Sequence, residues 1–393
     1  MASPGRISEV VVIGGGVVGI SIAYHLAKRG CRDVVVVEKN YLGSGSTEKC
    51  PGGIRQQFAA EVNVRLSVES VRFFERFEEE TGHAADFRQD GYLILATSQE
   101  DLAAFAESVP LQRRLGVDVE SLPAEDVAAM VPGLECADIL GATFCPTDGF
   151  ADPYSVVSGF ASAARRLGVT ILEDTEATAI DLRAGKVDGV TTSRGRLATP
   201  LVVNAAGPWA AAVGRMAGVD IPVRPSRRHV FVTGPVFNRP GPFRRLRDRR
   251  LPMVIDFATG FWFRREGPSL IFGMRNPAEP AGFSLDIDWD FFTGELAPVA
   301  CRRLPALRET GIARAQAGLH SDTPDRMAVL GEAPEVGGLH LACGFSGHGF
   351  MHAPAVGRVM ADLILDGTVS PDVAALRPDR FRQGETSGEA AFI

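Results

Sequence analysis

Apolar and polar residues alternate along the chain in blocks that predict strands and helices. Residues 10–13 (VVVI) form the first apolar run, residues 20–30 (ISIAYHLAKRG) carry an amphipathic pattern, and Val34–Val37 form a second apolar run. Apolar runs of about four to eight residues indicate buried strands, and a longer mixed segment between them indicates a helix. The beginning of the chain therefore predicts a β-α-β unit.

The rest of the chain continues with both kinds of pattern. Helices are predicted at 60–81, 99–115, 123–130, 154–167, 289–304 and from near Pro354 onward. Strands are predicted at 86–97, 201–207 and 339–344, with a hairpin at 183–189. Asp90-Gly91 is typical of a hairpin turn, so residues 86–97 are expected to form a strand pair. Residues 221–273 consist of β-runs rich in Arg, Phe and Pro.

These changes of pattern predict an α/β fold with two domains. Segments 1–85, 146–220 and 315–393 have the pattern of a nucleotide-binding domain around a central parallel sheet. Segments 86–145 and 221–314 are expected to form a substrate-binding domain on a mixed, mainly antiparallel sheet. A chain of 393 residues is long for a single hydrophobic core, which supports the division.

The composition is that of a globular protein and argues against several classes. Apolar residues make up 45% of the chain and charged residues 23%, and a net charge of −7 argues against a nucleic-acid surface. No apolar run reaches the roughly 20 residues that a membrane span requires. The N-terminus (MASPGRIS) lacks the regions of a signal peptide, so a cytoplasmic location is expected. The cysteines lack metal-ligand spacing, so no metal site is predicted and reduced thiols are expected.

A glycine motif, Gly14-x-Gly16-x-x-Gly19, stands between the first strand and the first helix, and Glu38 directly follows the second strand. In a dinucleotide-binding unit these glycines allow a tight turn, a close approach of the backbone to a pyrophosphate, and close packing of helix on strand. The acid accepts hydrogen bonds from a ribose hydroxyl and would repel a 2′-phosphate, which leaves FAD or NAD. The position of the motif near the N-terminus favours FAD.

Further motifs accompany the glycines: GSGSTEKCPGGIRQQF at 43–58, VVNAAGPWA at 202–210, TPDRMAVLGE at 323–332 and GFSGHGF at 344–350. With them the chain resembles, over nearly its full length, the D-amino-acid-oxidase superfamily of FAD-dependent oxidoreductases. It is most similar to the sarcosine oxidase and L-proline dehydrogenase β-subunit branch, whose members oxidise secondary amino acids. The resemblance implies a Rossmann-like FAD-binding domain of the glutathione-reductase type beside a substrate domain.

The resemblance also assigns site residues, and this chain departs from the pattern at three of them. Arg55, in the IR pair, is expected to hold the substrate carboxylate. Met351 stands where monomeric sarcosine oxidases have a second carboxylate-binding lysine. Gly318 stands where they attach FAD to a cysteine, so FAD is expected to be non-covalent. Ile271 stands where they have a lysine over the flavin, so reaction with oxygen is expected to be slow unless Lys49 supplies the charge.

The sequence allows two roles for each of two histidines and one tryptophan. His348 is a candidate general base or a structural hydrogen-bonding residue, and His320 is a candidate pocket residue or a buried structural histidine. Trp209 is expected near the cofactor or in the core. The arginines of segment 224–250 are expected on a solvated face. The residues expected to contact FAD are Gly14, Gly16, Val17, Val18, Gly19, Glu38, Lys39, Gly45, Ser46, Thr47, Gly53, Ile54, Ala206, Gly207, Trp209, Gly344, Ser346, Gly347, His348, Gly349, Phe350 and Met351.

The expected activity is FAD-dependent oxidation of an N-methyl or cyclic secondary amino acid. Sarcosine is the first candidate, with glycine, formaldehyde and hydrogen peroxide as products. The alternative is the catalytic β-subunit of an L-proline or other N-methyl amino acid dehydrogenase, which passes electrons to the FMN of a partner or to a quinone. A third hypothesis is that the protein binds flavin as a component of an assembly and catalyses no reaction of its own. The expected partners are an amino acid and an electron acceptor, oxygen or another; a monomer and a hetero-oligomer both stay open.

Overall fold

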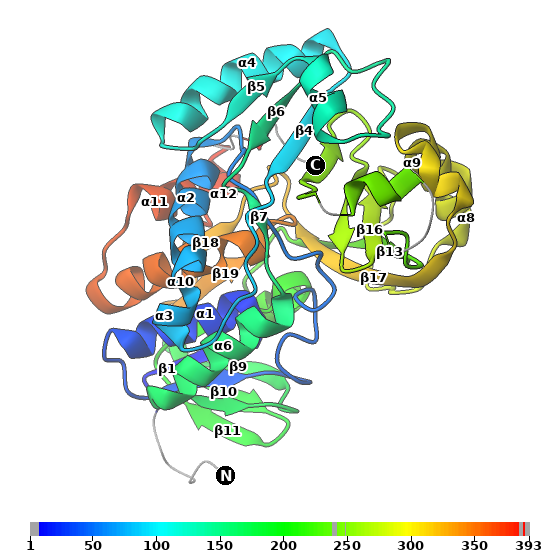
Figure 1. The fold of residues 1–393 in the computed structure, drawn as a ribbon. Helices are drawn as coiled ribbons and strands as arrows, with labels where there is room; N and C mark the ends of the chain where they lie inside the picture. The colour runs from blue at the N-terminus through cyan, green and yellow to red at the C-terminus, as the bar shows by residue number, and fades with distance from the viewer. Residues whose placement is uncertain (1–7, 238–241, 248, 385–387, 390–393) are drawn as a thin grey trace.

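Two large sheets organise the computed structural model, which describes residues 8–237, 242–247, 249–384 and 388–389 (Figure 1). The first sheet has six strands in the order β18-β19-β12-β1-β2-β8. Neighbouring strands are parallel, except that β18 runs antiparallel to β19. The strands are β1 (Val10–Ile13), β2 (Val34–Val37), β8 (Thr170–Leu172), β12 (Val202–Asn204), β18 (Val329–Glu332) and β19 (Leu339–Cys343).

Successive side chains of β1 and β2 are buried on opposite faces of this sheet, because the side-chain direction in a strand repeats every two residues. The even-numbered residues pack into one core with the helices, and the odd-numbered residues pack into another with a three-stranded antiparallel sheet and α7. The helices are α1 (Val17–Lys28), α2 (Glu61–Glu75), α3 (Phe77–Thr81), α6 (Pro153–Arg166), α7 (Ala210–Met216) and α10 (Gly349–Asp366). The three strands are β9 (Ala177–Arg183), β10 (Lys186–Thr192) and β11 (Gly195–Ala198).

The second sheet has eight strands in the order β17-β13-β16-β15-β14-β4-β6-β5. Its pairs are antiparallel except for the parallel pair of β14 and β4, which joins two stretches of chain that are far apart in sequence. The strands are β4 (Tyr92–Ala96), β5 (Glu120–Leu122), β6 (Gly141–Cys145), β13 (Arg224–Thr233), β14 (Met253–Asp256), β15 (Trp262–Glu266), β16 (Ser269–Met274) and β17 (Ile312–Asp322). The predicted α/β class, with a parallel sheet and a mainly antiparallel one, is confirmed.

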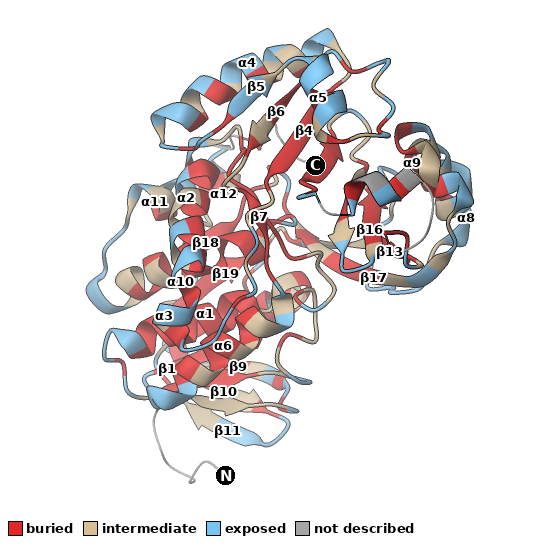
Figure 2. Ribbon diagram, viewed as in Figure 1, coloured by how far each residue is buried: buried red, intermediate tan, exposed pale blue. Residues whose placement is uncertain are grey.

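Helices cover the outer side of the second sheet and enclose a core rich in phenylalanine, which includes Phe231, Phe261, Phe263 and Phe272. Buried residues follow the inner strands and helices, and the outward turns of α4, α8 and α11 are exposed (Figure 2). The remaining helices are α4 (Gln99–Arg114), α5 (Ala124–Met130), α8 (Trp289–Phe291), α9 (Ala297–Arg303), α11 (Pro371–Ala375) and α12 (Arg380–Gln383). Within the described residues, no helix combines the length and apolar character that a membrane crossing needs.

Two local predictions were wrong. Residues 86–97 do not form a hairpin at Asp90-Gly91: Arg88 pairs with Phe150, while β4 pairs with β6 and β14. Pairing with distant strands buries β4 on both sides, which a two-stranded ribbon could not do. The last long helix begins at Gly349 rather than near Pro354, because a proline in the second turn removes only one intrahelical hydrogen bond. The division into domains by residue number stays a prediction.

Candidate active site

A cavity of about 490 Å³ lies between the two sheets. On one side it is lined by the junction of β1 and α1, by the loop after β2 and by residues 205–209. On the other side it is lined by β13, β14, β15 and β17 of the second sheet, and residues 347–351 also contribute to the lining. The carboxyl end of a parallel sheet is where open α/β folds bind their ligands.

The glycine motif shapes the nucleotide end of the cavity. Gly14 has a φ of 111°, and a Cβ there would lie 2.5 Å from the carbonyl oxygen of Ala205. A Cβ at Gly19 would collide with the carbonyl oxygen of Gly14, so this glycine allows helix and strand to approach. Gly16 is different: a Cβ there would meet only Thr47 Oγ1, at 3.4 Å, and would otherwise point into the cavity. Gly16 therefore leaves open space beside the N-terminus of α1, where Val17 N donates to Thr47 Oγ1 at 3.2 Å, and this space suits a pyrophosphate.

Glu38 is fixed beside this motif with its carboxylate at the cavity. Its Oε2 accepts a hydrogen bond from Gly15 N (2.8 Å) and its Oε1 accepts one from Asn40 N (3.0 Å). Each oxygen keeps a lone pair for a further donor, such as a ribose hydroxyl. Next to it, Lys39 Nζ lies 3.6 Å from the ring centre of Trp209, which lines the cavity. Glycine cradle, acid and aromatic residue together fit the expected adenosine diphosphate part of FAD.

The loop before α10 brings its backbone to another part of the cavity wall. Ser346 has a φ of 49°, and its N–H donates to Ser321 O at 3.0 Å. Its Oγ accepts a hydrogen bond from Thr323 N at 3.1 Å. These bonds turn Gly347 into the cavity, where a Cβ would come within 2.6 Å of the His320 ring. The backbone of this loop can therefore contact a ligand, and the hydrogen bonds of Ser346 hold the loop in place.

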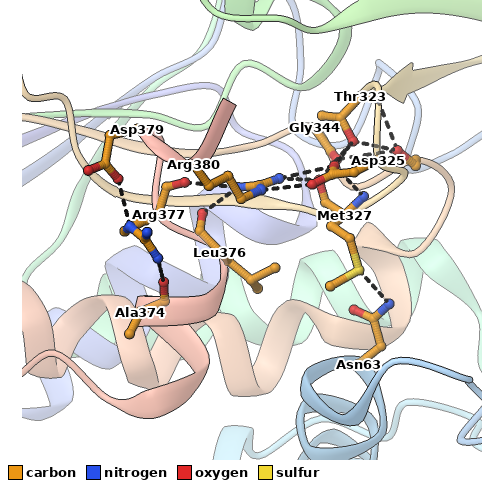
Figure 3. A network of polar contacts seen from close by, with 11 residues as sticks. Asn63, Thr323, Asp325, Met327, Gly344, Ala374, Leu376, Arg377, Asp379 and Arg380 are labelled. Carbon is orange, nitrogen blue, oxygen red and sulfur yellow. Dashed lines mark hydrogen bonds and ion pairs between the residues drawn. The ribbon is translucent and has the colours of Figure 1, made fainter. Parts of the chain in front are cut away.

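A buried ion pair between Arg380 and Asp325 supports the same loop (Figure 3). Arg380, on α12, donates from Nε to Asp325 Oδ2 at 2.8 Å and from Nη2 to Asp325 Oδ1 at 3.2 Å. Asp325 Oδ1 also accepts from Thr323 Oγ1 (3.2 Å) and from Met327 N (3.1 Å). Because Thr323 in turn contacts Ser346, the C-terminal helix is connected to the loop that lines the cavity.

Arg55 follows the short strand β3 (Gly53–Ile54), which pairs with β7 (Gly149–Phe150), and its guanidinium lines the cavity. The residue is 3% exposed, and the guanidinium carbon lies 4.2 Å from the ring centre of Phe58. Burial lowers the pKa of Arg55, and the negative charges of Glu389 and Asp148 act against that shift. An arginine remains cationic even so, so the cavity contains a buried positive charge that suits a carboxylate.

Two neutral histidines lie beside Arg55. His348 lines the cavity and packs edge-on against Phe58, with ring centres 4.8 Å apart. Burial, followed by the charge of Arg55, lowers the pKa of His348 well below its usual range. The same two causes lower the pKa of His352 to about 3, and its Nε2 lies 2.9 Å from Ser67 Oγ. At neutral pH both imidazoles are therefore uncharged.

Three further candidates lie on the cavity wall in different settings. His320 is half-buried, and burial, followed by the charge of Arg228, lowers its pKa. Lys49 Nζ donates to Ser44 O (3.0 Å) and pairs with Glu48, so its charge is compensated locally. Met351 is 8% exposed and presents a thioether where the resemblance would put a lysine. Arg55, 3% exposed, is thus more deeply buried than Lys49 on this wall.

Most of the sequence-predicted site residues meet at this one cavity. Those that line it are Arg55, Lys49, His348, His320, Met351, Gly14, Gly16, Val17, Val18, Glu38, Lys39, Gly45, Ser46, Thr47, Gly53, Ala206, Gly207, Trp209, Gly347, Gly349 and Phe350. Gly19, Ile54, Gly344 and Ser346 lie behind the lining. A Cβ at Gly344 would lie 2.5 Å from Thr323 Cγ2, so close packing explains that glycine. The role of each residue toward FAD or substrate stays a prediction.

Sequence reasoning missed the part of the wall that the second sheet contributes. Tyr92, Met253 and Ile255 form an apolar cluster with Trp262, and all four line the cavity. The signal was the alternation at the start of β15: Phe261, just before the strand, and Phe263 enter the core, and Trp262 between them faces the other way.

The expectation of a solvated arginine face was wrong for Arg228. Its side chain is only 16% exposed, lines the cavity and donates to Asp322 Oδ2 at 3.3 Å. In the register of β13 with β17 it lies opposite Gly318, a residue without a side chain.

A known protein family matches most of this chain. The family model described as FAD dependent oxidoreductase matches residues 9–363. The chain is 33% identical over 394 residues to the mitochondrial sarcosine dehydrogenase of Homo sapiens, covering 96% of this chain and 42% of that protein. It is 32% identical over 397 residues to the mitochondrial dimethylglycine dehydrogenase of Rattus norvegicus, covering 97% of this chain and 45% of that protein. The chain thus spans less than half the length of these relatives.

A solved structure is similar over the full length. The L-proline dehydrogenase from P. horikoshii matches with a TM-score of 0.89 at 36% identity, covering 97% of this chain and 100% of that one. The resemblance stated from the motifs is therefore confirmed, and the glycine cradle, Glu38 and the backbone of Gly347 fit the cofactor of that family. The chain belongs to the family of FAD dependent oxidoreductases, and its cofactor is FAD.

Proposed function

We propose that this protein oxidises a secondary amino acid with FAD, with sarcosine as the first candidate substrate and L-proline as the second. The observation that carries the proposal is Arg55, a buried guanidinium on the wall of the cavity that also contains the glycine cradle. A guanidinium binds a carboxylate with two parallel hydrogen bonds, and the apolar cluster around Tyr92 suits the remaining N-alkyl part.

The residues of the chain would act by binding and orientation. Arg55 would fix the carboxylate, so that one C–H bond next to the nitrogen is held in a single direction. Held by the glycine cradle and Glu38, FAD would supply the acceptor for a hydride from that carbon. The uncharged ring of His348, which lines the cavity, would lie toward the amine. Because only the free amine has the lone pair that drives the reaction, kcat/KM is expected to rise toward alkaline pH.

The electron acceptor has two candidates. Oxygen would be reduced to hydrogen peroxide. With either acceptor, the two-electron oxidation of sarcosine would give an iminium product, which water would hydrolyse to glycine and formaldehyde. The lysines of the cavity favour a partner subunit or a quinone as the acceptor. In the described chain, the lysines that line the cavity are Lys39, which lies over Trp209, and Lys49, which pairs with Glu48. Neither ammonium group is a free charge for stabilising superoxide. The names of the relatives, which are dehydrogenases, point the same way.

An anaerobic titration of the FAD-loaded protein tests the proposal. Sarcosine, L-proline, dimethylglycine and glycine are added in turn while the visible flavin absorbance is followed. We expect sarcosine or L-proline to bleach the flavin, and glycine, a primary amine, to leave it oxidised. Bleaching by none of the four would refute the proposed substrate class. Peroxide release in air then separates oxygen from another acceptor.

Two further assignments belong to this proposal. We expect FAD to be held without a covalent bond, because Gly318 lines the cavity where related oxidases carry a cysteine. Acid precipitation that releases all the FAD into the supernatant would support this. We also keep the cytoplasm as the proposed location, which fractionation of the source cells would test; the two curated relatives carry the word mitochondrial in their names.

A further inference from the structure

The loop that carries Arg55 is fastened to a fully buried carboxylate, Asp148. The backbone N–H of Gln56 donates to Asp148 Oδ1 at 2.8 Å, and the side-chain amide of Gln56 donates to the same oxygen at 3.1 Å. The side-chain amide of Gln57 donates to Asp148 Oδ2 at 3.0 Å and to Tyr92 O at 3.1 Å. Asp148 is 0% exposed, so water does not compete for these bonds.

The backbone around Asp148 leaves it little freedom to move. Asp148 directly precedes β7, and β7 pairs with β3, the two residues that precede Arg55. A Cβ at Gly149 would collide with the carbonyl oxygen of Arg88, so this turn is packed tightly against its neighbour. The carboxylate and the guanidinium loop therefore belong to one compact unit made of two short strands.

A second buried carboxylate holds the other end of the same loop. Glu389 accepts hydrogen bonds from Ala59 N (3.0 Å) and Ala60 N (3.1 Å), just before α2, and from the side chain of Asn63 (2.8 Å). Residues 56–60 are thus bound at both ends by acids that come from distant parts of the chain. Both acids also act electrostatically on Arg55. Burial raises the pKa of Asp148 to about 6, so the carboxyl group is ionised above neutral pH.

We propose that Asp148 is a positioning residue: through Gln56 and Gln57 it sets the direction in which Arg55 meets the substrate carboxylate. This inference rests on the proposed function of Arg55. A bidentate contact depends strongly on direction, so a small rotation of the loop would cost one of its two hydrogen bonds. Asp148 does not line the cavity, so it acts on binding through its neighbours, and the proposal assigns that effect to Arg55.

A double-mutant cycle separates positioning from a general loss of structure. The probe is acetate, a carboxylate without an amine, titrated into the FAD-loaded protein and followed by the flavin spectrum. We expect Asp148→Asn to raise the Kd of acetate about tenfold in the wild-type background and to leave it unchanged in the Arg55→Ala background. An equal loss in both backgrounds, or no loss in the wild type, would overturn the inference.

Controls keep the cycle interpretable. Asp152→Asn changes an exposed aspartate four positions along, whose side chain caps α6 through Ser155 N (2.7 Å), and should leave the Kd unchanged. Gln57→Met removes one of the bonds to Asp148 and keeps the carboxylate; it provides the same cycle if Asp148→Asn does not fold. A loss of acetate affinity that survives in the Arg55→Ala background would refute positioning for that variant too.

The two proposals fail in different ways. If Arg55→Ala binds acetate, sarcosine and L-proline as tightly as the wild type, the proposed function of Arg55 is wrong. If Arg55→Ala loses affinity but Asp148→Asn does not, only the positioning role is wrong. A positioning role also predicts that Asp148→Asn raises KM more than it lowers kcat, because saturating substrate can still select the correct direction of Arg55.

Discussion

Arg380 and Asp325 form a bidentate ion pair in which both side chains are almost completely buried, at 2% and 3% exposure. Replacing the cation by methionine would leave a buried carboxylate without its charged partner. We expect Arg380→Met to lower the free energy of unfolding by about 3–5 kcal/mol, the range for breaking a buried pair. Denaturant unfolding of the FAD-loaded protein measures this.

The matched control for that ion pair lies on the surface. Arg194 is 60% exposed and 3.8 Å from Asp174, so Arg194→Ala should cost less than about 1 kcal/mol. Because Asp325 supports the loop of Ser346, Arg380→Met should also release FAD more readily. A variant as stable as the wild type would show that Asp325 does not depend on this arginine.

Gly16 and Gly19 should respond differently to the same change. A Cβ at Gly16 meets only Thr47 Oγ1 and otherwise enters the cavity, so Gly16→Ala should lower FAD affinity at least tenfold with little effect on the apoprotein. A Cβ at Gly19 collides with the backbone of Gly14, so Gly19→Ala should lower the Tm of the apoprotein itself. Thermal unfolding without FAD and fluorescence titration with FAD measure the two effects. Unaltered FAD binding by Gly16→Ala would mean that the pyrophosphate lies elsewhere.

Removal of the guanidinium at Arg55 should weaken substrate binding and spare the fold. We expect Arg55→Ala to lower the affinity for sarcosine and L-proline by roughly 10- to 100-fold, because a hydrogen bond to a charged group contributes about 1.5–3 kcal/mol. Anaerobic spectral titration gives the dissociation constants. Arg65, half-exposed on α2 and paired with Glu61, is the control, and Arg65→Ala should bind as the wild type does.

Acid should destabilise the protein through its buried histidines. The pKa of His352 is lowered on folding from 6.5 to about 3, so between these values the unfolded chain binds a proton that the folded chain does not. The free energy of unfolding should therefore fall as the pH falls through this range, by up to about 1.4 kcal/mol per pH unit from this group. His352→Gln should reduce the slope, and His83→Gln, at an exposed position, should not. Equal slopes in all three proteins would contradict the assignment.

The sequence predicted what depends on local pattern. Residues close in the sequence determine the structure of the four valines of β2 and of the glycines before α1. The β-α-β unit and the type of ligand that it binds could therefore be predicted. Arg55 was identified through its motif, and the cavity brings it together with His348 and Met351 as expected. Their chemical roles remain predictions.

What the sequence could not predict depends on pairing over long distances. Nothing near Tyr92 shows that its strand lies beside Met253, so the apolar wall of the cavity was missed. Arg228 looked like a surface residue because only the register with β17 puts it opposite Gly318. Asp148 and Glu389 meet the Arg55 loop from 92 and 330 residues away, and no local signal marks either of them.

The interlocking of α1 with α10 has a consequence for how the polypeptide matures. Ser21 Oγ donates to Ala353 O at 2.7 Å, and a Cβ at Gly357 would collide with that same hydroxyl group. The face of α1 that contacts α10 therefore stays uncovered during synthesis until a segment 332 residues later leaves the ribosome. We expect nascent chains that stop at residue 348 to retain no flavin and to be captured by chaperones, whereas chains that extend through residue 389 should acquire the yellow colour.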